Sequence, residues 1–280
     1  MSKVHLSRIS LVLVTIAVTI FFFNMGATSA MAQGLLDAFS PIFSFPRLEG
    51  EARLRLIGTQ LLSGKVVVPS QQLAWDLKSD FGLEPNELFL DSMVRVQLGR
   101  LSVRLCYEMR DYKGNTPLTT LPNLSFGEAR FDYTGLRLGG DFDVVQWGRS
   151  RAGIDLDYDL FNPNFTANIY DANRGKQING TAALTIGTHI VYNPTFTLYG
   201  VSGIAEARAR WSVSGTELTD WEVSGGLKSP ETVLGSVALE GGYRRTSIGF
   251  HDTEVFNNVP ASADFNADIG GWFGEIVYYY

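Results

Sequence analysis

The chain has 280 residues and a formal net charge of −6 at pH 7, with 45% hydrophobic residues and a mean hydropathy of +0.04. Apart from one N-terminal stretch it contains no apolar run of about 18 residues, which excludes a bundle of membrane-spanning helices. An acidic chain without a basic cluster is poorly suited to binding nucleic acid. The high glycine and aromatic content and the single cysteine, Cys106, favour a β-rich protein without a disulfide framework.

The first 32 residues predict a cleaved secretory signal peptide. Lys3 and Arg8 precede an apolar block over residues 9–23, and Ala30 and Ala32 form the A-x-A pattern that signal peptidase accepts. A retained transmembrane anchor is the alternative, but it needs about 20 apolar residues and does not explain the two alanines. We therefore expect export and cleavage after Ala32.

The rest of the chain shows a hydrophobic period of two, which is typical of β-strands. Residues 101–110 are the clearest case, because Leu101, Val103, Leu105, Tyr107 and Met109 share one face while Ser102, Arg104, Cys106, Glu108 and Arg110 share the other. A soluble β-sandwich also alternates, but its turns show no directional asymmetry. Here short connections, such as 99–100 and 146–149, alternate with long polar ones, such as 113–125, 162–176 and 251–264. Bacterial outer-membrane barrels combine short periplasmic turns with longer external loops in this way.

A membrane strand takes about 9–11 residues, so the mature chain suits an antiparallel transmembrane β-barrel of 8 to 12 strands. Ten strands are predicted, with twelve or eight as alternatives; they cover 48–57, 89–98, 101–111, 127–144, 150–161, 178–192, 195–211, 217–228, 232–246 and 266–280. Segment 71–77 is assigned to the first external loop. Changes of phase near Gly135 and Gly203 predict two β-bulges. The domain division is a signal peptide over 1–32, a periplasmic N-terminal segment over 33–46 and the barrel over 47–280.

The C-terminus places Trp272, Ile276, Tyr278 and Tyr280 on one strand face and stops on an aromatic residue. This resembles the terminal strand of Gram-negative outer-membrane β-barrels, in which the final aromatic residue is part of the signal for the barrel-assembly machinery. The segment Trp75-Asp76-Leu77-Lys78-Ser79-Asp80-Phe81-Gly82-Leu83 and the segment Gly241-Gly242-Tyr243-Arg244 resemble a group of small, functionally uncharacterised outer-membrane barrel proteins. The resemblance implies a barrel and a compartment, and no activity.

Charged residues occupy the strand phase opposite the apolar face. The predicted lumen network comprises Arg53, Arg55, Arg95, Arg104, Glu108, Arg110, Glu128, Arg130, Asp155, Asp157, Glu206, Arg208, Arg210 and Glu275. The interior of a barrel of eight to ten strands is about wide enough for its own side chains, so mixed charges are expected to pair across it and fill it. A narrow charged conduit is the alternative, favoured if there are twelve strands.

The sequence predicts neither a catalytic site nor a metal-binding site. His189 lies on the lumen phase, and no hydroxyl nucleophile accompanies it at the His-x-Ser spacing found in lipid A deacylase barrels. His251, Asp252 and Glu254 lie in a loop and are expected to be solvated, so no metal site and no cofactor are predicted.

The expected function is that of a monomeric outer-membrane barrel with a structural or surface-interaction role through its long external loops. A narrow channel for ions or small solutes and an enzyme acting on lipid A or phospholipid are the alternatives, because a fold alone does not fix a function. The expected partners are outer-membrane lipids, lipopolysaccharide and the barrel-assembly machinery, with no nucleic acid and with the external partner unspecified.

Overall fold

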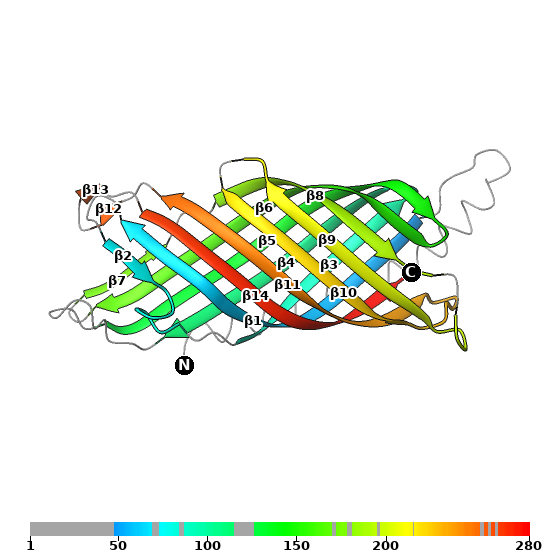
Figure 1. Cartoon of the computed structure of the whole chain (residues 1–280), viewed down its shortest axis with the longest axis horizontal. Helices are drawn as coiled ribbons and strands as arrows, with labels where there is room; N and C mark the ends of the chain where they lie inside the picture. Colours follow the sequence, from blue (N-terminus) through cyan, green and yellow to red (C-terminus); the bar gives the residue numbers. More distant parts are fainter. Residues whose placement is uncertain are drawn as a thin grey trace.

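Ten antiparallel strands form a closed barrel in the computed structural model (Figure 1), as the sequence predicts. Each strand pairs with the next along the chain, and β14 pairs with β1 from Glu51↔Tyr279 to Val67↔Asp264, which closes the sheet. The barrel strands are β1 (Leu48–Val68), β3 (Glu87–Leu98), β4 (Leu101–Gly114), β5 (Phe126–Trp147), β6 (Ser150–Ile169), β8 (Thr181–Tyr192), β9 (Ser202–Ser212), β10 (Glu217–Lys228), β11 (Ser236–Asp252) and β14 (Ala263–Tyr279).

The structure describes residues 48–68, 73–83, 87–114, 126–169, 172–177, 181–194, 197–214, 216–252, 255–256, 259–260 and 263–280. The predicted signal peptide (1–32) and periplasmic segment (33–46) lie outside the described residues, as does Glu254. Among the described residues, no helix is long and apolar enough to cross a membrane.

Four further short strands lie at one end of the barrel, and the C-terminus lies at the other (Figure 1). They are β2 (Leu73–Asp76), which pairs with β1, β7 (Ala172–Gln177), which pairs with β6, and the pair β12 (Val255–Phe256) and β13 (Val259–Pro260). The end that carries them also carries the long connections, and we call it the loop end. The other end carries the tight turns, for example at Gly99 and Gly148, both with positive φ, and we call it the turn end. Residues 73–76 of the segment 71–77 thus form β2 within the connection between β1 and β3, residues 71–72 lie outside the described residues, and the assignment of this connection to the external side stays a prediction.

The outer surface is apolar over a band that fits a lipid bilayer. Leu101, Val103 and Leu105 of β4 are 62%, 60% and 48% exposed, and equivalent outward side chains on the other barrel strands are exposed in the same way. Such a continuous apolar surface on a closed barrel is the surface that faces lipid in outer-membrane proteins. The protein is therefore a transmembrane β-barrel of the outer-membrane type.

Aromatic residues mark the border of this band toward the loop end. Trp221, Tyr243 and Trp272 on neighbouring strands contact one another, with ring centroids 5.5 and 5.2 Å apart. Directly beyond them on β11 and β14, Arg245 and Asp268 form an exposed ion pair. Aromatic side chains prefer the interface and charged ones prefer water, so the bilayer ends here.

The strands continue past this border as a collar that stands outside the bilayer. We define the collar as residues 60–68 of β1, 126–134 of β5, 245–252 of β11 and 263–270 of β14. Strands β1 and β5 have 21 and 22 residues, whereas spanning a membrane takes about 9–11. At about 3.3 Å per residue the eight or nine collar residues of each strand extend over roughly 26–30 Å along it.

The interior of the collar is filled by an apolar layer. Phe131, Phe265, Phe250, Phe161 and Tyr133 form a closed circuit of ring contacts with centroids 4.9 to 6.5 Å apart. Because β5 and β6 are not neighbours of β11 and β14 in the sheet, these rings meet across the interior and not along one wall. We call this cluster, together with the buried residues around it, the aromatic layer.

Part of the connection between β1 and β3 packs into the same layer. Leu77, Phe81 and Leu83 are 0 to 3% exposed and belong to the apolar cluster that includes the aromatic rings. The backbone amide of Gly82 donates to the carbonyl of Lys78 and Gly82 has φ +59°, which is the αL arrangement that ends a helical turn; the Leu83 amide donates to the carbonyl of Leu77. The resemblance segment 75–83 is thus a turn that inserts three apolar side chains into the mouth of the barrel.

The turn is stabilised by two aspartates. The amides of Lys78 and Ser79 donate to Asp76 Oδ1 at 2.9 Å, and the Asp76 amide donates to Asp80 Oδ2 at 2.8 Å. Partial burial opposes the ionised form of Asp76, but the donated amide hydrogen bonds outweigh it and lower the pKa of this carboxyl below its usual value.

Candidate functional site

Below the aromatic layer the barrel interior is filled with charged side chains. Strand alternation sends every second side chain inward, and on these positions the sequence places arginine or carboxylate side chains on nine of the ten barrel strands and His189 on β8. The inward charged side chains are Glu51, Arg53, Arg55, Asp91, Arg95, Arg104, Glu108, Arg110, Arg137, Asp141, Asp143, Arg151, Asp155, Asp157, Asp159, His189, Glu206, Arg208, Arg210, Asp220, Glu222, Glu240, Arg244 and Glu275. We call this set the charge network.

Arg104 is the centre of one part of the network. Its Nη2 donates to both carboxylate oxygens of Asp157 at 2.6 and 2.8 Å, and its guanidinium lies 3.2 Å from Asp141 and 3.8 Å from Asp155. Arg104 is 1% exposed, so water does not screen these contacts. A buried arginine held by three carboxylates fixes β4 against β6 across the intervening strand.

Gly139 on β5 makes this crossing possible. A Cβ atom at this position would lie 2.0 Å from Asp157 Oδ1 and 2.8 Å from Arg104 Nε. Any side chain here would therefore displace the Arg104–Asp157 pair. Glycine weakens a strand interior, and in this position it leaves room for two other side chains to meet.

Other pairs join strands that are not neighbours in the sheet. Arg244 of β11 contacts Glu108 of β4 at 2.7 Å. Arg55 of β1 donates to both oxygens of Glu222 on β10 at 2.6 and 2.8 Å. These contacts run across the lumen, so the network is a packed cross-section and not a lining around an open path. A cavity of about 60 Å³ remains within it.

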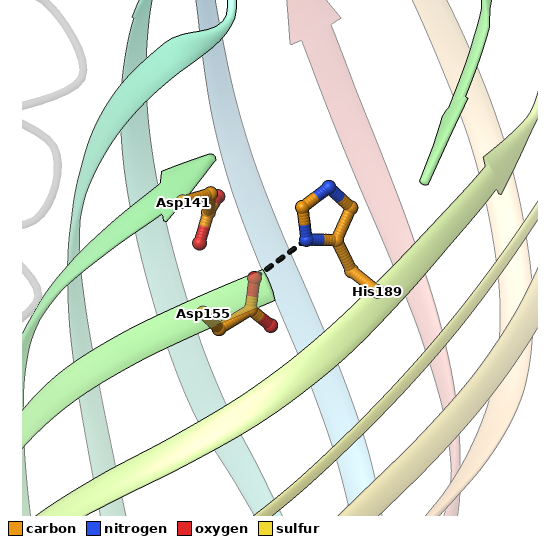
Figure 2. A group of neighbouring side chains, drawn as sticks. All are labelled: Asp141, Asp155 and His189. Carbon is orange, nitrogen blue, oxygen red and sulfur yellow. Dashed lines mark hydrogen bonds and ion pairs between the residues drawn. The ribbon is translucent and has the colours of Figure 1, made fainter. Parts of the chain in front are cut away.

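His189 lies between Asp155 and Asp143 at the edge of the network. Its Nδ1 is 2.5 Å from Asp155 Oδ1 (Figure 2). Its Nε2 is 2.9 Å from Asp143 Oδ1. Both ring nitrogens donate together only in the imidazolium form. Within the described part of the chain no hydroxyl is hydrogen-bonded to His189.

Asp141, Asp155 and His189 are also the one group in the described residues that brings three metal-ligating side chains together, with ligand atoms within 4.8 Å of one another. Arg208 lies 3.7 Å from both carboxylates, and Arg104 lies 3.2 and 3.8 Å from them. A metal ion would be repelled by two guanidinium groups at this distance. The group is better suited to ion pairing than to binding a cation.

The structure places twelve of the fourteen predicted lumen residues in the charge network. The other two are Glu128 and Arg130. The Glu128 side chain lies outside the described residues. Arg130 does not point inward: it lies on the outer face of the collar, where its guanidinium donates to Asp111 at 2.7 and 2.9 Å. The prediction failed because it assumed a bulge near Gly135. The pairing of β4 with β5 runs without a shift from Leu101↔Phe142 to Gly114↔Ala129, so Arg130 and the inward Arg137 differ in phase.

The bulge predicted near Gly203 is also wrong. Strand β9 begins at Ser202 and pairs regularly with β8 and β10, and the preceding residues belong to the turn. The register shifts among the described residues lie between Leu61 and Ser63, between Phe126 and Ala129 and between Asp143 and Val145.

Several residues of the charge network were absent from the predicted set, including Asp91, Asp141, Asp143, Asp220 and Arg244. These residues could have been identified from the sequence, because they alternate along their strands with outward apolar residues. The aromatic layer was missed for a different reason: Phe131 and Tyr133 are apolar and yet face inward, which alternation alone assigns to lipid.

The C-terminal residues Trp272, Ile276, Tyr278 and Tyr280 share the outward phase of the closing strand. Trp272 and Ile276 are 73% and 53% exposed, and the rings of Tyr278 and Tyr280 stack with centroids 6.2 Å apart. Tyr280 exchanges backbone hydrogen bonds of 3.0 Å with Gly50 on β1. Their role as an assembly signal stays a prediction.

No protein-family model matches this chain, and no curated protein matches it. Among solved structures it is similar to the outer membrane protease OmpT from Escherichia coli, with 12% identity and a TM-score of 0.43 over 85% of this chain and 99% of that one. It is similar to the translocator domain of the autotransporter NalP from Neisseria meningitidis, with 12% identity and a TM-score of 0.43 over 90% and 97% of the two chains. It is also similar to the outer membrane protein OprG from Pseudomonas aeruginosa, with 6% identity and a TM-score of 0.38 over 83% of this chain and 95% of that one. At these identities and TM-scores the similarities assign no activity to this chain.

Proposed function

We propose that this protein is a non-conducting outer-membrane barrel that acts through its collar and external loops, in a structural or surface-interaction role. The observation that carries the proposal is the filling of the interior by two successive layers, the charge network and the aromatic layer. A solute would have to cross both of them.

The charge network resists opening because its members depend on one another. Arg110, for example, contacts both oxygens of Asp91 at 2.5 and 2.9 Å and is 2% exposed. Moving one such arginine aside leaves a buried carboxylate without its counter-charge, which costs about 3–5 kcal/mol. The aromatic layer adds a second barrier, since ions do not cross packed aromatic rings.

The collar supports a surface role. It rests on a packed apolar interior, so the strands that reach beyond the bilayer form a rigid base for the loops between them. Rigid scaffolds that present loops are a common arrangement for binding. The partners of His189 are the carboxylates Asp155 and Asp143, which is the arrangement of an ion-pair network.

Site-specific labelling tests the placement of the collar. Ser79→Cys in the inserted turn and Val233→Cys in the β10–β11 turn are both exposed positions, and Val233 is 97% exposed. A membrane-impermeant maleimide should label Ser79→Cys on intact cells and label Val233→Cys only after the outer membrane is permeabilised. The opposite pattern would place the collar in the periplasm and end the surface proposal.

Swelling of proteoliposomes tests the barrier. Vesicles that contain the refolded protein should swell in isotonic arabinose or glycine no faster than protein-free vesicles. Swelling at the rate of a general porin would favour the channel alternative.

A further inference from the structure

A second cavity, of about 370 Å³, lies inside the barrel at the turn end. Its floor is Arg53 of the charge network, which is bonded to Glu51, Glu206 and Glu275, so the cavity ends there. Cavities of about 300–1,000 Å³ are the usual size for small-molecule sites. We call this cavity the turn-end pocket.

Arg151 on β6 differs from the other inward arginines. Each of the others has a carboxylate oxygen within 3.5 Å, whereas the nearest carboxylates to Arg151 are Glu51 at 3.9 Å and Asp143 at 4.0 Å. Its Nε is buried and, among the described residues, makes no hydrogen bond. Arg151 lines the turn-end pocket and therefore offers a guanidinium to whatever enters it.

Lys228 on β10 is a second cation without a close counter-charge. Its ammonium lies 3.9 Å from the ring centroid of Tyr279, and in the described part of the chain no carboxylate lies within 4 Å of it. The remaining charges on the wall largely cancel, because Arg149 and Glu231 form an ion pair of 3.3 Å. The carboxylates of the pocket wall are Glu49 and Glu231, and Glu231 is the one that pairs with Arg149.

Asn193 supplies an acceptor. The residue is 7% exposed and is held in place by its backbone amide, which donates to Ser150 Oγ at 2.9 Å. Its Oδ1 is buried and accepts no hydrogen bond from any described residue. A buried acceptor without a partner costs about 1–3 kcal/mol, so a ligand with a donor at this point would recover that cost.

We propose that the turn-end pocket binds a small multivalent oxyanion from the periplasm, a carboxylate or a phosphate that also carries a hydroxyl group. Arg151 binds one oxyanion group through charge-assisted hydrogen bonds, Lys228 neutralises a second charge, and Asn193 Oδ1 accepts from the hydroxyl. This binding site is independent of the proposed surface role, because the pocket opens at the opposite end from the collar.

The test is calorimetric titration of the refolded mature chain, residues 33–280, in detergent micelles and in a buffer free of phosphate and carboxylates. Citrate and inorganic phosphate are the two probes. We expect saturable binding of at least one probe with a stoichiometry of one, and the stronger probe identifies the oxyanion as carboxylate or phosphate.

Matched variants locate the site. Arg151→Gln and Lys228→Gln should each weaken binding about tenfold or more, the effect of losing one charge-assisted contact. Arg100→Gln removes an exposed arginine at the same end but outside the pocket, and it should leave binding unchanged. Heat-modifiable gel migration verifies that each variant is folded. If either lumen variant does not fold, Asn193→Ala replaces it, with weaker binding of citrate expected.

Two results would overturn the proposal. One is the absence of saturable heat for both probes at millimolar concentration with folded wild-type protein. The other is probe binding that Arg100→Gln weakens as much as Arg151→Gln does. This would show that the anions are attracted by the positive charges at the turn end in general and not bound in the pocket.

Discussion

Removing Arg104 should destabilise the barrel far more than removing an arginine from its surface. Arg104 is buried against Asp157, Asp141 and Asp155, so Arg104→Leu leaves three carboxylates with less positive charge around them. Breaking a buried ion pair in this way costs about 3–5 kcal/mol. Arg245 pairs with Asp268 outside the bilayer, with a side chain that is 45% exposed, and Arg245→Leu should cost about 0–1 kcal/mol.

A second substitution isolates the cause. In Arg104→Leu/Asp157→Asn one carboxylate charge is removed together with the arginine, while Asp141 keeps Arg95 at 3.3 Å and Asp155 keeps His189. The double variant should therefore be more stable than the sum of the single effects, with a coupling energy of about 1–3 kcal/mol.

Urea unfolding in phospholipid vesicles, followed by tryptophan fluorescence and by gel migration without heating, measures these free energies. The reasoning is refuted if Arg104→Leu costs no more than Arg245→Leu. It is also refuted if the effects of Arg104→Leu and Asp157→Asn add without coupling, because the two side chains would then not depend on each other.

Three further predictions follow from the strand phase and the packing. Leu105→Arg places a charge on the lipid face and should cost about 2–4 kcal/mol in the same unfolding assay, whereas a cost of about 0–1 kcal/mol would contradict the placement of Leu105 near the bilayer midplane. Gly139→Ala should lower the unfolding free energy, because the new methyl group overlaps the Asp157 carboxylate; unchanged stability would mean that the pair shifts freely. Deleting residues 278–280 removes the pairing of β14 with β1 near Glu51, and fractionation should find less protein in the outer membrane, whereas wild-type abundance would show that these residues neither close nor address the barrel.

The lipid-facing half of the fold could be predicted from the sequence because one rule governs it. On β4 the outward residues Leu101, Val103 and Leu105 are apolar and the inward ones are polar, so alternation gives both the strand and its orientation. The short turns and long loops then fix the two ends. The ten strands were predicted for this reason.

The aromatic layer could not be predicted in the same way. Phe131 and Tyr133 are apolar and inward because they lie above the bilayer, where the inside of the collar is the dry side and the outside faces water. The rule for membrane strands is therefore reversed within a single strand. In sequence this reversal looks the same as a bulge at Gly135, and that interpretation put Arg130 on the wrong face.

Which arginine pairs with which carboxylate in the charge network also could not be predicted from the sequence. Arg104 meets Asp157 two strands away because of the register between β4, β5 and β6, together with the space that Gly139 leaves. Alternation predicts which residues point inward, but the pairing across the interior depends on the stagger of the strands around the closed barrel.

The central claim is that the charge network and the aromatic layer block the lumen to ions. Single-channel recording in planar lipid bilayers tests this claim most directly. The refolded protein should insert, as verified by heat-modifiable migration of the same sample, and produce no resolved conductance steps in molar potassium chloride. Steady, uniform steps from the wild-type protein would mean that ions pass both the charge network and the aromatic layer, and would contradict the account.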